Sequence, residues 1–237
     1  VWATWLVDRD NARQLSYQLA SEAVARARLI EAELRAYAAE VERLGRRVSA
    51  PDASADFDLQ EYGRQQPSRH PREFSYFMVV RVPDHERAIH EGRARDLGLP
   101  DYTIREALAD GELASAARRP VYYPLRDTMP RTMGTRFGLD FGTDPLRLAF
   151  VEKARDSGEA VLTPPTPAVR YGRRTRVVLI MHPFYEGGGL PGSVLLRRAL
   201  FRGLAGGGLE VETLLDRIAG SDGNPLALVV TDEDEDG

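Results

Sequence analysis

Asp140 is the residue best suited to bind a small molecule, and it stands in a Gly138-Leu139-Asp140 turn shortly before a helix start at Asp144-Pro145. The order of elements in the stretch around it suits a small pocket in which one acidic group awaits a ligand, and it offers no obvious catalytic machinery. A single carboxylate can accept hydrogen bonds from the N–H groups of a ligand. It can also bond the backbone N–H groups of its own turn, as Asp often does before a helix. Both interpretations stay open at this stage.

Other patterns that could carry chemistry lack the surroundings that this chemistry requires. The chain has no cysteine, which excludes disulfides and zinc–thiolate sites. His85 and His90 are five residues apart and do not share a helix face as a metal pair would. The glycines of residues 187–192 match a dinucleotide loop only formally, because Pro191 and the absence of a βαβ unit argue against it. The acidic run 232–236 stops before a calcium loop could close, and no serine lies in a nucleophile elbow. We therefore predict no catalytic residue, no metal and no cofactor.

Composition places the chain among ordinary globular proteins. It has 237 residues, of which 43% are hydrophobic and 29% are charged, enough for one large domain or two small ones. The net charge of -4 argues against a dedicated nucleic-acid binder, which needs a basic face. One local exception is an arginine cluster formed by Arg170, Arg173, Arg174 and Arg176. It is either a solvated hairpin or a contact for an anion, and the sequence leaves both open.

Residues 11–48 predict a single long helix. They contain no Pro, their only Gly is Gly45, and Ala, Leu, Glu and Arg predominate. Apolar residues recur at spacings of three and four and form one stripe along about 55 Å. A second copy of the helix could cover this stripe, so we expect a parallel dimer along the stalk, with packing on the helix's own domain as the alternative. The preceding VWATWLV segment could be the outer end of a membrane-spanning helix or a short buried segment.

The remaining sequence alternates strands and helices in an order that favours an antiparallel sheet with helices on one side, an α+β fold. Strands are expected at 74–82, 102–106, 121–125, 160–163, 176–185 and 226–231, and helices at 84–97, 144–158 and 209–218. The turn between the second and third strands is placed at Asp110-Gly111. Gly187-Gly188-Gly189 would break the chain into two such units.

A series of short motifs resembles the CHASE domain, the extracytoplasmic sensor of membrane-bound cyclases and histidine kinases. Each motif is weak alone, but their number, order and spacing make the resemblance specific. In chain order they are Arg81-Val82-Pro83, Glu86-Arg87, the run from Pro100 to Glu106, Tyr122-Tyr123-Pro124, Gly138-Leu139-Asp140, the run from Ala154 to Gly158, Ala160-Val161-Leu162-Thr163 and Pro183-Phe184-Tyr185.

The resemblance implies a long N-terminal stalk helix followed by two tandem PAS-like antiparallel-sheet units. The stalk would be residues 1–50, the membrane-distal ligand-binding unit 51–186, and a membrane-proximal unit 187–237. In the plant cytokinin receptors of this family an acidic residue binds the adenine ring and a leucine backbone completes the contact. Those positions correspond to Asp140 and Leu162 here. The other candidate ligand-binding residues are Tyr122, Phe137, Thr163 and Met181.

The function expected from this resemblance is small-molecule sensing on the periplasmic face of the inner membrane. The ligand would be adenine-like (cytokinin-like) or a small carboxylate. A stalk-helix homodimer would carry the signal to a cytoplasmic histidine kinase of a two-component system or to a nucleotide cyclase such as a diguanylate cyclase. A dimerisation spacer without its own ligand is the alternative. Nucleic acid is not an expected partner.

Overall fold

The structure is a computed structural model, and it describes residues 2–50, 57–66, 74–108, 112–131, 136–170 and 173–220. By its internal contacts the chain separates into two units. One comprises Val1–Ala36 together with Leu214–Gly237, and the other is Tyr37–Thr213. The second unit contains the whole β-sheet and every candidate ligand-binding residue, so most of the structural argument concerns it.

Helix α1 (Trp2–Ser49) confirms the predicted stalk and is longer than expected at both ends. Pairs of opposite charge one turn apart support it, for example Arg26 with Glu22 and Arg46 with Glu42. The helix ends just before Pro51, because the residue preceding a proline is disfavoured in the helical conformation. Among the helices that the structure describes, α1 included, none combines the length and the apolar character needed to cross a bilayer.

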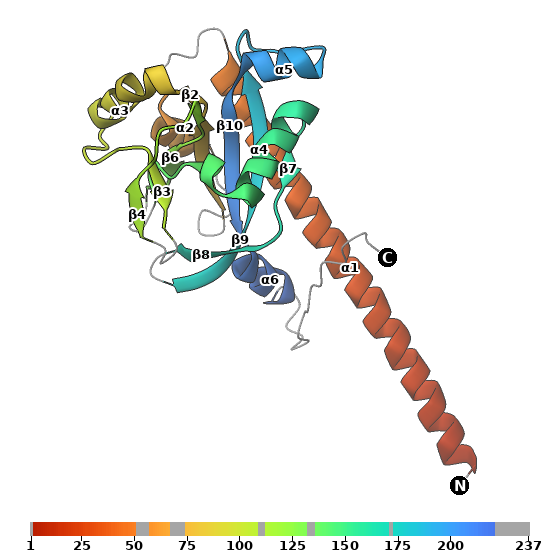
Figure 1. Ribbon diagram of the computed structural model, residues 1–237. Helices are drawn as coiled ribbons and strands as arrows, with labels where there is room; N and C mark the ends of the chain where they lie inside the picture. The colour runs from red at the N-terminus through yellow and green to blue at the C-terminus, as the bar shows by residue number, and fades with distance from the viewer. Residues whose placement is uncertain are drawn as a thin grey trace. The chain divides into compact units, whose positions relative to one another are not determined.

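An antiparallel sheet follows the stalk, as predicted (Figure 1). Its strand order is β6-β1-β10-β9-β7, and β8 pairs with β9 beside this path. The bounds are β1 (Phe74–Val80), β6 (Leu125–Met129), β7 (Val161–Leu162), β8 (Thr166–Arg170), β9 (Arg173–Tyr185) and β10 (Phe201–Glu210). Two small ribbons stand beside it, made by β2 (Val82–Pro83) with β5 (Val121–Tyr122) and by β3 (Arg105–Ala107) with β4 (Leu113–Ser115).

Short helices surround the sheet, and local signals explain where they begin and end. They are α2 (Leu59–Gln65), α3 (Arg87–Asp96), α4 (Pro145–Ser157), α5 (Val194–Leu200) and α6 (Val211–Gly220). Helix α4 agrees closely with the predicted 144–158, because Asp144 caps its first N–H groups and Gly158 closes it in the left-handed conformation. Two single 3-10 turns, Asp84–Glu86 before α3 and Phe141–Thr143 before α4, complete the set.

The two faces of the sheet are buried against different helices. Phe74 of β1 stacks on Tyr37 of α1 with 4.7 Å between ring centroids, so this face meets the part of α1 from Tyr37 onward. Phe77, three residues later, points to the opposite face because side chains alternate along a strand. There it packs in a cluster with Val151 and Ala154 of α4, which lies against the sheet in Figure 1.

Strand β10 occupies the centre of the sheet between β1 and β9, and sequence reasoning missed it. Its central residues are Ala205-Gly206-Gly207-Gly208, and none of them is β-branched or aromatic. Their composition therefore gives no strand signal. Because β10 belongs to the same sheet as β1, the predicted domain boundary at residue 187 lies inside one unit, and the chain returns to the sheet after the Gly187–Gly189 break. Its contacts extend this unit to Thr213.

The remaining boundary and turn predictions lie partly outside the described residues. The expected strand at 226–231 and the Asp110-Gly111 turn belong to the ranges that the structure does not describe. The expected helix at 209–218 is confirmed as α6. The separate membrane-proximal unit predicted at 187–237 is not tested and stays a prediction.

Replacing a glycine of β10 tests why this strand has so few side chains. A Cβ added at Gly207 would lie 2.1 Å from the Phe74 ring and 2.9 Å from Val41 of α1. We expect Gly207→Ala to lower the free energy of unfolding by about 1–3 kcal/mol, because the packed rings must shift. Gly189→Ala is the matched control, since a Cβ there meets no atom within 4 Å. Urea unfolding of both variants measures the effect, and equal stabilities would contradict the proposed close packing.

Candidate ligand-binding site

The backbone around Asp140 is held between two neighbouring segments. The Arg105 N–H donates to the Gly138 carbonyl and the Asp140 N–H donates to the Arg105 carbonyl, each at 2.8 Å. On the other side, the Leu125 N–H donates to the Leu139 carbonyl at 2.9 Å. Gly138 has φ +79°, and an added Cβ would lie 1.9 Å from the Thr103 carbonyl oxygen, so only glycine fits this turn. These contacts fix where the carboxylate of Asp140 lies.

The Asp140 carboxylate is fully buried and uses its two oxygens differently. Oδ1 accepts hydrogen bonds from the Tyr123 N–H at 2.7 Å and from the Gly142 N–H at 2.9 Å. Oδ2 is also buried but accepts no hydrogen bond from the residues that the structure describes. Its nearest cation is Arg119, whose Nη1 lies 3.7 Å away, beyond hydrogen-bonding distance. Oδ1 therefore has a structural role, whereas Oδ2 is an acceptor without a donor among the described residues.

Burial dominates the electrostatics of this group. It raises the pKa of Asp140 above the ordinary value of 3.8, while the hydrogen bonds from Tyr123 and Gly142 and the charge of Arg119 act against that rise. Arg119 is shared, because its Nη2 also pairs with Glu106. This ion pair lowers the pKa of Glu106, so Glu106 holds the guanidinium more strongly than Asp140 does. The negative charge of Asp140 is therefore only partly compensated by Arg119.

Two of the other predicted site residues lie in different apolar clusters. Met181 belongs to the α4-side cluster together with Phe141, the residue after Asp140. Tyr122 belongs to a second cluster that contains Val82 and Ile104. The Tyr122 hydroxyl donates to Asp84 and accepts from the Arg119 N–H, each at 3.0 Å, so its polar atom already has partners.

Of the last three predicted residues, Leu162 and Thr163 lie at the edge of the sheet, and Phe137 lies in the Gly138 turn. Leu162 is opposite Ile180 in the β7–β9 pairing, and its side chain is 41% exposed. Thr163 closes that pairing, because its N–H donates to the Leu179 carbonyl at 2.9 Å and its Oγ1 accepts from the Leu179 N–H at 3.0 Å. Phe137 is half-buried beside Gly138. The structure therefore does not gather the six predicted residues around one point.

Arg119 and Tyr123 are the site residues that sequence reasoning missed. Arg119 is 21 positions from Asp140 in the chain, and nothing in its local sequence marks it as a partner of that acid. Tyr123 contributes its backbone N–H, which any residue could supply. The Tyr122-Tyr123-Pro124 motif that contains it, however, could have indicated this neighbourhood, because Pro124 forms an isolated antiparallel β-bridge with Asp140.

The arginine cluster of the β8–β9 hairpin is consistent with a solvated face. Arg173 and Arg174 are exposed, and Arg176 donates from Nε to Glu212 Oε1 at 2.7 Å. The side chain of Arg170 lies outside the described residues. Within the part of the chain that the structure describes, no group of three or more His, Cys, Asp or Glu side chains could hold a metal ion.

Comparison with known families decides the family of this sensor-like fold. The family description "CHASE domain" matches residues 55–237, more than half of the chain. The chain belongs to the CHASE domain family. It is thus an extracytoplasmic sensor domain, and the expectation drawn from the short motifs is confirmed. No curated protein matches the chain.

Solved structures similar to this CHASE domain include two ligand-binding or sensory domains of bacterial chemoreceptors and a chemotaxis protein. One is the ligand-binding domain of the Pseudomonas aeruginosa amino-acid chemoreceptor PctC in complex with GABA, with 17% identity, a TM-score of 0.43, and coverage of 86% of this chain and 64% of that chain. Methyl-accepting chemotaxis protein X has 16% identity, a TM-score of 0.43 and coverage of 86% and 66%. The periplasmic sensory domain of the Campylobacter jejuni chemoreceptor Tlp1 has 11% identity, a TM-score of 0.44 and coverage of 86% and 62%. The chain spans less than two thirds of each of these domains.

The raised pKa of Asp140 predicts a pH-dependent stability. A carboxyl whose folded-state pKa is raised stabilises the fold at low pH, and this contribution is lost as pH rises above 3.8 through the folded-state value. Asp140→Asn keeps an oxygen for the Tyr123 and Gly142 N–H groups but cannot ionise. We therefore expect wild type to lose stability relative to Asp140→Asn as the pH rises. Urea unfolding of both proteins over a pH series measures this difference; a flat or opposite trend would contradict it.

Proposed function

We propose that this CHASE domain senses a small molecule whose N–H groups donate to Asp140. The observation that carries the proposal is the buried Oδ2 atom of Asp140 without a hydrogen-bond donor among the described residues. An unpaired buried acceptor of this kind destabilises the protein by about 1–3 kcal/mol, and more when it is charged. A ligand that supplies the missing donor recovers that free energy on binding.

The chemistry of the site favours an adenine-like ligand over a small carboxylate. Adenine-type molecules with the ring proton on N7 present a ring N–H and an exocyclic N–H on one edge, and a carboxylate can accept from both. A ligand carboxylate would instead lie beside the negative charge of Asp140. A molecule without the N–H groups would leave the acid unpaired, so the site would discriminate strongly against it.

Arg119 provides the route by which a ligand could reach Asp140. Its side chain is 32% exposed, whereas that of Asp140 is fully buried. At 3.7 Å its contact with Oδ2 is too long for a hydrogen bond, and its second nitrogen is held by Glu106. Displacing Arg119 from Asp140 therefore costs little, and the ligand's N–H groups would take its place.

A thermal-shift screen with adenine derivatives, small carboxylates and common metabolites tests this proposal. We expect at least one N–H-donating compound to raise the melting temperature of the domain. Asp140→Asn should weaken its binding by about tenfold or more, because a charge-assisted hydrogen bond is lost. Asp101→Asn removes an exposed acid and is the matched control. An adenine-type hit that is unchanged in Asp140→Asn would contradict the assignment of the site.

We further propose that binding is transmitted by a dimer of α1. From Tyr37 onward α1 packs on the sheet through Tyr37, Val41 and Leu44, all buried. In the other unit the same stripe continues through Leu19 and Ala23, which are exposed. A second α1 would cover them, and ligand-dependent movement of the sheet would shift the dimer between two states. We also propose that a cytoplasmic kinase or cyclase receives this signal.

The dimer is tested by sedimentation velocity over a range of protein concentrations. We expect the wild-type chain to self-associate and Leu19→Glu to shift it toward monomer, because a charge would be buried in the helix seam. Ala32→Glu places the same charge at an exposed position on the opposite side of the helix and should leave association unchanged. Association that is equally strong in both variants would place the interface elsewhere.

A spacer without its own ligand is the second candidate function, and one observation favours it. The α4 face of the sheet is closely packed by buried residues that include Phe77, Phe141 and Met181. Failure of every compound in the thermal-shift screen, combined with a dimer that Leu19→Glu dissociates, would favour the spacer.

A further inference from the structure

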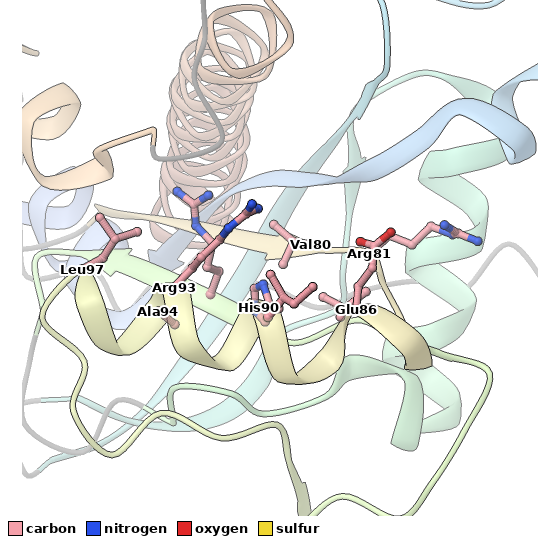
Figure 2. Close-up of a pocket in the computed structure, with 10 residues that line it drawn as sticks. Val80, Arg81, Glu86, His90, Arg93, Ala94 and Leu97 are labelled. Atoms are coloured by element: carbon pink, nitrogen blue, oxygen red, sulfur yellow. The ribbon is translucent and has the colours of Figure 1, made fainter.

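A pocket of about 490 Å³ lies along α3, away from Asp140. It is lined by Val80 and the β2 region on one side and by α3 on the other, as Figure 2 shows. Its volume falls within the range of about 300–1,000 Å³ that is usual for small-molecule sites. Neither Asp140 nor Arg119 lines it. It is therefore separate from the site proposed above.

The charged lining of this pocket is mainly positive. Arg81, Arg93 and Arg126 line it, with Glu86 as the one acidic residue among them. In Figure 2, Arg93 and His90 project from α3 toward the side on which Val80 lies. His90 adds no charge near neutral pH, since burial and then the charge of Arg126 lower its pKa to about 4.

Arg93 is distinguished from the other arginines of α3 by its lack of a partner. Arg87 donates to the Ala116 carbonyl at 2.9 Å, and Arg95 donates to the Tyr102 carbonyl at 3.0 Å, so both hold the fold together. The Arg93 guanidinium forms no hydrogen bond or ion pair with the residues that the structure describes, and the same is true of Arg81. Both are free to bind an anion.

The two acids of the adjoining hollow are already engaged with other groups. Asp127, in the adjoining hollow that shares Arg126, accepts from Nε and Nη2 of Arg131, each at 2.9 Å. Asp58, in the same hollow, caps α2 by accepting from the Gln60 and Glu61 N–H groups. The positive charges of Arg93 and Arg81 therefore remain available.

Apolar side chains complete the lining, and two of them, Ile89 and Leu97, are exposed. Ile89 is 58% exposed and Leu97 is 41% exposed, and both lie on the pocket side of α3 with Ala94. Val80 and Val82 contribute the facing wall. Covering such side chains stabilises a complex by roughly 25 cal/mol per Å² of apolar area removed from water.

We infer that this pocket binds a small organic anion, a carboxylate with an apolar chain of several carbons. The carboxylate would lie against Arg93, since a guanidinium group matches its geometry with paired N–H donors. Arg126, whose Nη2 already donates to the Phe57 carbonyl, would add its charge beside it. The chain would cover Ile89 and Leu97. The domain would thus have two ligand sites of opposite preference, a donor-binding site at Asp140 and an anion-binding site along α3.

Isothermal titration of the full 237-residue chain with linear carboxylates from acetate to octanoate tests the inference. We expect affinity to rise with chain length from acetate to hexanoate, and 1-hexanol to bind far more weakly than hexanoate because it carries no charge. Arg93→Gln should weaken hexanoate binding by about tenfold or more. Ile89→Ser should remove most of the gain with chain length, and both positions are exposed, so both variants should fold.

Two controls separate this site from other sources of binding. Arg174→Gln removes an exposed arginine outside the pocket and should leave hexanoate binding unchanged. Asp140→Asn should also leave it unchanged, so failure here and failure of the adenine-type site are distinguishable. The inference would be overturned if none of these carboxylates bound at millimolar concentration. The inference would also be overturned if hexanoate bound wild type and Arg93→Gln with equal affinity. Equal affinities of hexanol and hexanoate for wild type would overturn it as well.

Discussion

Close packing over the glycine-rich centre of β10 is the constraint on which the rest of the unit depends. The absence of side chains at Gly206 and Gly207 lets the rings of Phe77 and Phe74 lie directly on the backbone, one on each face. Helix α1 can then approach on the Phe74 side, where Val41 also borders Gly207. On the other side, α4 completes a closely packed cluster with Phe77. A side chain at these positions would separate both layers from the sheet.

The sheet built in this way holds Asp140 in a position that it would not adopt alone. Burying a carboxylate is unfavourable unless its oxygens are hydrogen-bonded. Two backbone N–H groups, from Tyr123 and Gly142, satisfy only Oδ1. Asp140 is therefore both a structural acceptor, through Oδ1, and a partly unsatisfied one, through Oδ2. The interpretation of Asp140 as a local backbone acceptor applies to Oδ1. Ligand binding stays a proposal, and it concerns only Oδ2.

Arginine has two distinct roles in this domain. Arg87 and Arg95 reach across to backbone carbonyls and hold the segments around α3 in place, and Arg198 ties α5 to Asp156 of α4. Arg93 and Arg81 have no such partner and line a pocket instead. Sequence composition cannot separate these roles, because a guanidinium that is engaged and one that is free are the same residue type on the same helix.

The sequence by itself determined the features that depend on neighbours within a few positions. Helix α1, strand β1 and the capped α4 helix follow from helix-forming runs, β-branched and aromatic residues, and the signals at Asp144 and Gly158, and ordered short motifs identified the CHASE family. Only the tertiary structure decided that β10 lies at the sheet centre, that Arg119 meets Asp140, and that Arg93 faces an open pocket. These features join residues far apart in the chain, and their free energy comes from packing and charge in three dimensions, which local propensity does not encode.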